Sequence, residues 1–303
     1  MYGDNQKWST APRDGTWDRN TGLDNDGDDI IDVQDSDTLA AANVWGQGGN
    51  DKIFGGLIAA DGEQNLNGGD GDDKIWTYNP GQSAPAGSGQ TNTNAGQDGD
   101  DIIYGARGTD YLYGDFVFSD QKSAVGGDDT IYTGEGSTTS QGDFVSAGFG
   151  DDKVYGQGAG EHVIQGNWGD DKIWGGEGKN AIWGDDGGAS HFDEETLTWN
   201  DYGLESGDDT LYGGELQDRI DGGAGHDYIH GLDGGDYLYG GSGEDTIWGG
   251  AGNDFISTGK GWDTVFGGDG CDWIFSEDGG DVLWGGECEP NATEGDPVDG
   301  TTQ

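Results

Sequence analysis

The C-terminal part of the chain repeats a nine-position pattern of small, polar and apolar residues. Residues 204–284 divide into nine consecutive blocks of nine residues without a gap. Every block has Asp at position 6 and an aliphatic residue at position 8, and all but one have Gly at position 4, the exception being Leu216. A repeat this regular predicts one array of stacked units rather than several independent domains.

Upstream, the same block recurs with interruptions. Clear copies start at residues 46, 68, 96, 105, 124, 147, 166 and 175, and looser copies start at 24, 59, 138 and 157. Position 6 departs from Asp only at Gln64, His162 and Asn180 in these copies. We therefore expect a repeat array over 24–284, preceded by an N-terminal cap or extension (1–23) and followed by a C-terminal cap and tail (285–303). Its larger insertions are 77–95, 114–123 and 184–203.

Two of the insertions suggest local structure. Segment 77–95 is polar and rich in turn-forming residues, which predicts a protruding loop. In segment 184–203, Ser190 precedes His191-Phe192-Asp193-Glu194-Glu195, which suggests a short helix with Ser190 as its N-terminal cap.

Each block predicts a tight turn followed by a short strand. Gly at positions 1, 2 and 4 permits positive φ and close approach of backbone segments. Positions 7 to 9 then form a three-residue strand, in which position 8 points inward and positions 7 and 9 point outward. The chain is thus predicted to be all-β, with one aliphatic side chain buried per block.

Composition by itself suggests disorder, because 61 Asp and Glu face 12 Lys and Arg and the net charge is −49. The 12 Trp, 12 Tyr and 9 Phe argue against that interpretation. The sequence has no apolar run long enough to span a membrane. Such an acidic chain is repelled by phosphate backbones, so we expect no nucleic-acid partner.

The block GGxGxD-x-aliphatic-x, as in GGAGHDYIH (222–230) and GGSGEDTIW (240–248), resembles the repeats-in-toxin (RTX) family of hemolysin-type calcium-binding repeats. The resemblance implies that two blocks form one 18-residue coil of a right-handed parallel β-roll, a type of β-solenoid. It also implies calcium ions in the turns, held by position-6 carboxylates and backbone carbonyls.

Electrostatics leads to the same metal. Stacked coils place equivalent Asp residues roughly 4.8 Å apart, where two carboxylates repel by about 0.9 kcal/mol in bulk water and by more near protein. Such a column requires cations, and hard oxygen ligands favour Ca²⁺. If Asp and Gly were only turn formers, Asp would not recur at one position in nine successive blocks. We expect several Ca²⁺ ions, with these ligands: Asp29, Asp51, Asp73, Asp101, Asp110, Asp129, Asp143, Asp152, Asp171, Asp209, Asp218, Asp227, Asp236, Asp245, Asp254, Asp263, Asp272 and Asp281.

The two cysteines fit the same period. Cys288 follows Cys271 by 17 residues, one short of an 18-residue coil, so the pair is predicted to lie on adjacent coils within disulfide reach. Two free thiols are the alternative. A disulfide implies an oxidising setting, and we therefore expect a secreted, extracellular protein.

Outward positions of the predicted strands are rich in aromatic residues. Position 9 of alternate blocks and position 7 of the remaining blocks predict two columns, and a large exposed aromatic surface is typical of a contact site. The predicted contact surface comprises Tyr212, Trp248, Phe266, Trp284, Tyr237, Phe255, Trp273, Trp174 and Trp183. Three explanations stay open: packing against other subunits or the inserted loops, stacking on carbohydrate, and cross-strand stabilisation without a partner.

No catalytic motif accompanies the repeats. The sequence contains no H-E-x-x-H, no G-x-S-x-G and no P-loop, and the repeat explains its many carboxylates. We expect a non-enzymatic, calcium-binding structural or adhesive protein that self-associates into a fibre or layer. The alternatives are a polysaccharide-binding module and the secretion or folding module of a larger toxin or enzyme.

Overall fold

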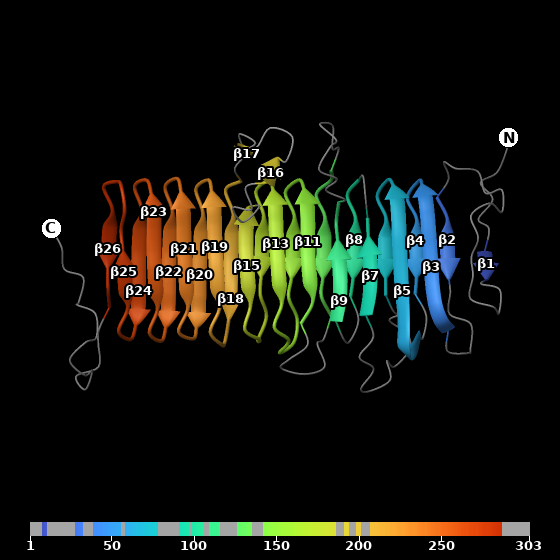
Figure 1. The fold of residues 1–303 in the computed structure, drawn as a ribbon, viewed down its shortest axis with the longest axis horizontal. Helices are drawn as coiled ribbons and strands as arrows, with labels where there is room; N and C mark the ends of the chain where they lie inside the picture. The colour runs from blue at the N-terminus through green and yellow to red at the C-terminus, as the bar shows by residue number, and fades with distance from the viewer. Residues whose placement is uncertain are drawn as a thin grey trace. The chain divides into compact units, whose positions relative to one another are not determined.

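The structure is a computed structural model that describes residues 8–10, 28–32, 39–55, 58–77, 91–96, 99–105, 109–115, 126–134, 142–185, 191–193, 198–200 and 207–286. Every helix or strand element in these ranges is a β-strand, so the all-β prediction is confirmed (Figure 1). No helix among them is long and apolar enough to cross a membrane. The chain forms two compact units, Met1–Val163 (unit 1) and Ile164–Gln303 (unit 2).

Unit 1 is built from two parallel sheets whose strands alternate along the chain. The first, sheet A, has the order β1 (Trp8–Thr10), β2 (Ile30–Asp32), β4 (Lys52–Phe54), β6 (Lys74–Trp76), β8 (Ile102–Tyr104), β10 (Thr130–Tyr132) and β12 (Lys153–Tyr155). The second, sheet B, has the order β3 (Leu39–Gly48), β5 (Ile58–Asp70), β7 (Thr91–Ala95), β9 (Thr109–Tyr113) and β11 (Phe144–Phe149).

Unit 2 repeats this plan, and most of its sheet A strands are longer than the three-residue sheet A strands of unit 1. Its part of sheet A contains β14 (Lys172–Trp174), β18 (Thr210–Gly214), β20 (Tyr228–Asp233), β22 (Thr246–Ala251), β24 (Thr264–Asp269) and β26 (Val282–Trp284). Its part of sheet B contains β13 (Val163–Trp168), β15 (Ala181–Asp185), β19 (Arg219–Ala224), β21 (Tyr237–Ser242), β23 (Phe255–Lys260) and β25 (Trp273–Phe275). Strand β13 begins with the last residue of unit 1.

The strand register shows that two blocks make one coil. In unit 2, Ile229 pairs with Ile247 and Ile247 pairs with Val265, each time 18 residues further along the chain. The intervening block lies in the other sheet, where Leu238 pairs with Ile256. This parallel, in-register stacking of coils is a β-solenoid of the β-roll type, as predicted.

The core of each unit is a stack of single aliphatic side chains from position 8. Their neighbours at positions 7 and 9 lie outward and are partly or fully exposed. The position-8 residues with no exposed surface are Ile53, Ile75, Ile103, Leu112, Ile131, Val145, Val154, Ile164, Ile173, Ile182, Leu211, Ile220, Ile229, Leu238, Ile247, Ile256 and Val265. A small number of apolar residues is therefore sufficient, because each coil contributes only two aliphatic position-8 side chains to the core.

The insertion predicted at 77–95 is too long. Thr91–Ala95 forms strand β7, which pairs in parallel with β5 and β9 and belongs to the roll. The repeat was hidden there because Asn92 and Asn94 occupy the positions expected for Asp and an aliphatic residue.

The helix predicted after Ser190 is also wrong for the residues that the structure describes. His191–Asp193 (β16) and Thr198–Asn200 (β17) form a two-stranded antiparallel sheet instead. Aromatic and β-branched residues such as Phe192, Thr198 and Trp199 favour strands over helices, and this preference outweighs the capping signal. Ser190 lies outside the described residues.

The remaining boundaries are only partly visible. Within segment 1–23, Trp8–Thr10 pairs with Ile30–Asp32 and extends sheet A. Of the insertion predicted at 114–123, the structure describes Gly114 and Asp115, and of the tail 285–303 it describes Gly285 and Gly286.

Truncation of one core residue tests whether the core is a single-file stack, with one position-8 side chain per block. We expect Ile229→Ala to lower the free energy of unfolding of the calcium-loaded protein by about 2–5 kcal/mol, since no adjacent side chain can fill the cavity. Thr246→Ala, which changes an outward position on the neighbouring strand β22, should stay within about 0.5 kcal/mol. Guanidinium unfolding measures both, and equal effects would contradict the single-file core.

Candidate metal centre: two columns of buried aspartates

Side chains at position 6 form one column beside each sheet, at the turn that precedes every strand. We call the column beside sheet A column A and the column beside sheet B column B. Column A contains Asp29, Asp51, Asp73, Asp101, Asp129 and Asp152 in unit 1, and Asp171, Asp209, Asp227, Asp245, Asp263 and Asp281 in unit 2. Column B contains Asp110 and Asp143 in unit 1, and Asp218, Asp236, Asp254 and Asp272 in unit 2.

One carboxylate oxygen of most column members connects neighbouring coils. The backbone N–H of Asp209 donates to Oδ1 of Asp227 at 2.9 Å, and the N–H of Asp227 donates to Oδ1 of Asp245 at 2.9 Å. In unit 1, Asp51 donates in the same way to Oδ1 of Asp73 at 2.7 Å. Each Oδ1 thus satisfies a buried backbone donor of the preceding coil, which lies at a turn where no strand ladder is available.

The second carboxylate oxygen is buried and has no hydrogen-bond partner in much of both columns. All column members except Asp29 and Asp281 are 0–7% exposed. Column members whose Oδ2 is buried without a partner include Asp51, Asp73, Asp101, Asp129, Asp209, Asp227, Asp236, Asp245, Asp254 and Asp272. Since a buried, unpaired carboxylate oxygen is costly, a whole column of them indicates a missing positive ligand.

Backbone carbonyl groups converge on the same places. A Cβ atom on Gly46 would clash with Oδ2 of Asp51 and with the carbonyl oxygen of Gly68 in the next coil. The same arrangement recurs in unit 2, where Asp227 Oδ2 and the carbonyl oxygen of Gly240 crowd the missing side chain of Gly222. Glycine at position 1 is therefore required to leave room for two oxygens of different coils.

This donor set fits calcium. In the part of the chain that the structure describes, no three His, Cys, Asp or Glu side chains lie close enough to hold a metal by themselves. Carbonyl oxygens would have to complete the coordination shell, and mixed carboxylate and carbonyl oxygens are what Ca²⁺ prefers.

Burial raises the pKa of the column carboxyl groups. Desolvation is the largest cause throughout, and the hydrogen bond from the preceding coil opposes it. The pKa rises to about 6 for Asp254, about 8 for Asp227 and about 10 for Asp101, where the Asp129 charge adds to the effect. Without a cation, the folded column therefore favours protonated carboxyl groups near neutral pH.

A second series of coil-to-coil hydrogen bonds, which we call the position-5 ladder, joins the exposed residues at position 5. Its donors and acceptors are arranged in the direction opposite to those at position 6. The N–H of Asp128 donates to Oδ1 of Asp100 at 3.0 Å, and the N–H of His226 donates to Oδ1 of Asp208 at 2.8 Å. The side chain at position 5 accepts a backbone N–H from the following coil, whereas the side chain at position 6 accepts one from the preceding coil. Sequence analysis missed this role, although Asp or Asn recurs at position 5 in most upstream blocks.

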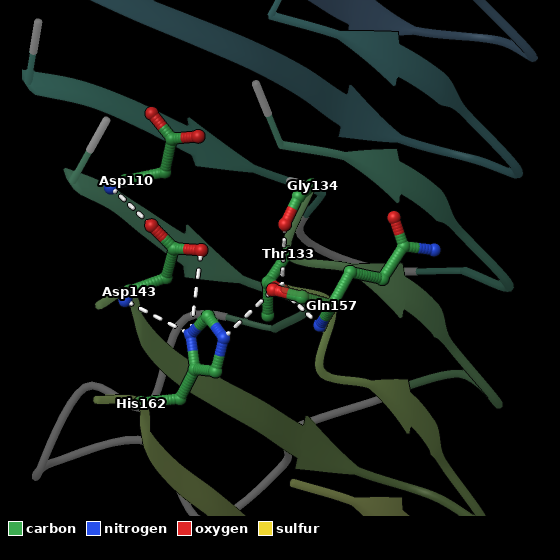
Figure 2. Close-up of polar contacts among 6 residues, drawn as sticks. All are labelled: Asp110, Thr133, Gly134, Asp143, Gln157 and His162. Atoms are coloured by element: carbon green, nitrogen blue, oxygen red, sulfur yellow. Dashed lines mark hydrogen bonds and ion pairs between the residues drawn. The ribbon is translucent and has the colours of Figure 1, made fainter. Parts of the chain in front are cut away.

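His162 replaces Asp in column B of unit 1 and keeps the ladder without a carboxylate (Figure 2). Its Nδ1 accepts the N–H of Asp143 at 3.1 Å, and Asp143 Oδ1 accepts the N–H of Asp110 at 2.8 Å. His162 Nε2 lies 3.1 Å from the carbonyl oxygen of Gln157, which assigns the ring proton to Nε2. The N–H of Gln157 in turn donates to Thr133 Oγ1 at 2.9 Å.

The imidazole of His162 is a neutral substitute for the column carboxylate. Burial lowers its pKa, so the 3.5 Å approach of Nδ1 to Asp143 Oδ2 is not an ion pair near neutral pH. In unit 2, Asn180 also stands at position 6, where its backbone N–H donates to Asp218 Oδ1 at 2.6 Å and its side-chain amide donates to the carbonyl of Gly178 at 3.0 Å. The three residues that replace Asp at position 6 (Gln64, His162 and Asn180) and Asn92 all lie at column B positions. Column B therefore holds fewer carboxylates than column A.

Cys271 forms a disulfide bond, and the chain contains only one other cysteine. That residue, Cys288, lies outside the described residues. Cys271 occupies position 5 of its block, and its N–H donates to Asn253 Oδ1 at 2.9 Å in the position-5 ladder.

The aromatic residues at position 9 of sheet A form a stacked ladder in each unit. In unit 1 the centroid distances are 4.7 Å for Phe54–Trp76 and 4.9 Å for Tyr132–Tyr155, with interplanar angles of 8° and 12°. In unit 2 the ladder runs through Trp174, Tyr212, His230, Trp248, Phe266 and Trp284. Neighbouring rings are stacked face to face, although Trp248 is 37% and Trp284 50% exposed.

The aromatic residues of sheet B in unit 2 are arranged differently. Arg219, Tyr237, Phe255 and Trp273 share one register, as predicted. Tyr237 and Phe255 are tilted by 35°, and Phe255 and Phe275 also by 35°. Tyr237 is 45% exposed, Trp273 44% and Phe275 48%, which leaves part of their ring faces open. Trp183 lies in this sheet as well, whereas Trp174 lies in sheet A.

Two parallel sheets joined by glycine-rich turns, with a buried Asp in most turns, define a repeat protein of the β-roll class. The chain belongs to the family described as RTX calcium-binding nonapeptide repeat (4 copies), which it matches over residues 43–57, 58–79, 87–116, 125–139, 137–160, 158–188, 205–238, 230–265, 239–274 and 257–287. This family is known for calcium binding. A search of curated proteins found no match.

The raised pKa values predict that the metal-free roll loses stability as pH rises. The column carboxyl groups bind protons more tightly in the folded than in the unfolded chain, where their pKa is 3.8. Their contribution is therefore complete below about pH 3.8 and is lost as pH rises through the folded values of about 6 to about 10. In chelator, the folded fraction measured by circular dichroism should therefore be higher at pH 5 than at pH 8.

Asp227→Asn tests whether the column causes this dependence. The variant keeps an acceptor for the N–H of Asp209 but loses one buried charge, so the metal-free protein should be more stable at pH 8 and less sensitive to pH. The exposed Glu177→Gln is the matched control, with no expected change in slope. An unchanged slope for Asp227→Asn would assign the pH effect to the overall charge instead.

Proposed function

We propose that the chain is a calcium-dependent β-roll whose ions complete the two aspartate columns. The observation that carries this proposal is the divided use of column carboxylates such as those of Asp227 and Asp245: Oδ1 joins the coils, and Oδ2 is buried without a protein partner. Ca²⁺ would be held by Oδ2 atoms and by carbonyl oxygens such as those of Gly68 and Gly240. The ion supplies the positive charge that the buried carboxylates lack.

Folding and metal binding are then one equilibrium, because the sites exist only when neighbouring coils are stacked. Each unit has few buried apolar side chains per coil and a large negative charge, so burial of apolar surface alone is a weak driving force.

An extracellular location is part of the proposal. It is supported by the disulfide of Cys271, which requires an oxidising environment, and by the RTX repeats, which are typical of secreted proteins. Extracellular calcium modules operate at Kd values of about 10⁻⁴–10⁻³ M. A protein with sites of this class stays unfolded where free calcium is low and folds after export.

A structural role, rather than catalysis, is supported by the described histidines of the roll. His226 Nδ1 accepts the N–H of Glu244 at 2.8 Å within the position-5 ladder. His230 stacks between Tyr212 and Trp248 in the aromatic ladder, and His162 replaces a column carboxylate. Each of these imidazoles contacts residues of a neighbouring coil.

We further propose that the protein self-associates through the outer face of sheet B in unit 2. The tilted and exposed rings of Tyr237, Trp273 and Phe275 support this choice. The sheet A ladder is a weaker contact surface, because most of its rings are stacked against neighbouring rings. Carbohydrate stacking requires open ring faces, so the tilted rings of sheet B support the polysaccharide alternative better than the stacked ladder does.

Calcium-dependent folding is tested by circular dichroism of the full chain. In chelator at pH 7.5 we expect a mainly unfolded spectrum, and Ca²⁺ should restore β-structure cooperatively, whereas Mg²⁺ should do so poorly because it demands rigid octahedral geometry. The same β content with and without chelator would refute the proposal.

The contact surface is tested by sedimentation of the calcium-loaded protein. Trp273→Ala should reduce self-association while calcium-dependent folding persists. Trp248→Ala, in the covered sheet A ladder, is the matched control and should change the oligomeric state little. A monomeric parent that binds a glycan array through Trp273 would support the polysaccharide alternative instead.

A further inference from the structure

Two Gly-Asp pairs, Gly114-Asp115 and Gly184-Asp185, stand at breaks in the repeat. Each Asp occupies position 2 of a turn, and the turn resumes only at residue 126 or 207. Elsewhere position 2 commonly adopts positive φ, as in Gly223 (109°) and Gly241 (110°). Asp115 and Asp185 are not among the described residues with positive φ, so the backbone departs from the regular turn at these residues.

The two Asp side chains make the same contact in the two units. Oδ2 of Asp115 accepts the N–H of Phe149 at 3.0 Å, and Oδ2 of Asp185 accepts the N–H of Ala224 at 2.6 Å. Phe149 and Ala224 both occupy position 3 of the next coil in their unit. The side chain of Asp115 is 4% exposed. Both carboxylates are thus directed back over the turn.

A buried column A carboxylate lies beside each pair. Asp129 is 0% and Asp209 1% exposed, and Oδ2 of each has no hydrogen-bond partner. These Oδ2 atoms crowd the space where a Cβ of Gly114 or Gly184 would lie, directly next to Asp115 or Asp185 in the chain. The carbonyl oxygens of Ala147 and Gly222 crowd the same two spaces.

Asp115 and Asp185 add a negative charge beside the buried carboxylates of Asp129 and Asp209. Asp115 directly follows Gly114, and Asp185 directly follows Gly184, so each turn holds a second carboxylate next to the residue that Asp129 Oδ2 or Asp209 Oδ2 approaches. An extra negative charge next to a buried carboxylate destabilises the metal-free turn and favours a cation there.

We propose that Asp115 and Asp185 each add a carboxylate ligand to the calcium site of Asp129 or Asp209, which creates one tighter site in each unit. The inference rests on the proposed calcium function. A carboxylate can accept an N–H and coordinate a cation at once, because its two oxygens offer about four lone-pair sites. Affinity for Ca²⁺ rises with the number of charged ligands.

These two sites would bind calcium first and order the turns that contain Asp115 and Asp185. In the second of these turns, the N–H of Gly207 donates to Asp185 Oδ1 at 3.3 Å. Calcium at low concentration would therefore order one turn in each unit before the regular turns bind their ions.

Calorimetric titration of the full chain with CaCl₂ tests the inference, with Tb³⁺ luminescence as a second readout. The parent should show a tight class of about two ions above a weaker class. Asp115→Asn and Asp185→Asn should each remove one ion from the tight class by weakening it about tenfold or more. Glu177→Gln, an exposed change of the same type, should leave both classes unchanged.

The outcomes separate the two proposals. A parent that binds no calcium overturns the proposed function, whereas a parent with two classes that both Asp variants retain overturns only the role of Asp115 and Asp185. Asn keeps an oxygen for the N–H of Phe149 or Ala224, so both variants should reach the parent's spectrum in saturating calcium. Failure to fold there would assign the two residues a purely structural role and also overturn the inference.

Discussion

The carboxylate at position 6 is the interaction on which the rest of the structure depends. Its Oδ1 accepts a backbone N–H from the preceding coil, as between Asp209 and Asp227, and so replaces the strand ladder at the turn. Its Oδ2 is buried with only carbonyl oxygens converging beside it. This hydrogen bond holds the carboxylate in a buried position, and the buried carboxylate requires a cation, so the same side chain couples coil stacking to calcium.

The other repeated positions serve this arrangement. Glycine at position 1 leaves room for Oδ2 and for a carbonyl of the next coil, as at Gly46 and Gly222. The aliphatic residue at position 8 fills a core only one side chain deep. Outside, stacked rings such as Phe266 and Trp284, with centroids 4.5 Å apart at 3°, add cross-strand contact that a thin core cannot provide.

Departures from the pattern were informative where the physical requirement could be met differently. His162 preserves the coil-to-coil hydrogen bond without a carboxylate, and it was visible as an exception in the sequence. Asn92 and Asn94 concealed a whole strand, because a repeat search depends on the residues that they replace. The short helix predicted after Ser190 was wrong because a local capping signal is weaker than pairing between His191–Asp193 and Thr198–Asn200.

The sequence alone determined the all-β roll, its period and its column of aspartates, because each requirement is local and recurs every nine residues. Only the tertiary structure decided how the two oxygens of each Asp are used, which departures share column B, and that the rings of sheet A cover one another whereas those of Tyr237 and Trp273 stay exposed. It also brought Asp115 and Asp185 beside Asp129 and Asp209. These relations join residues from different coils, and their distances depend on stacking and on insertion length, which a nine-residue pattern does not encode.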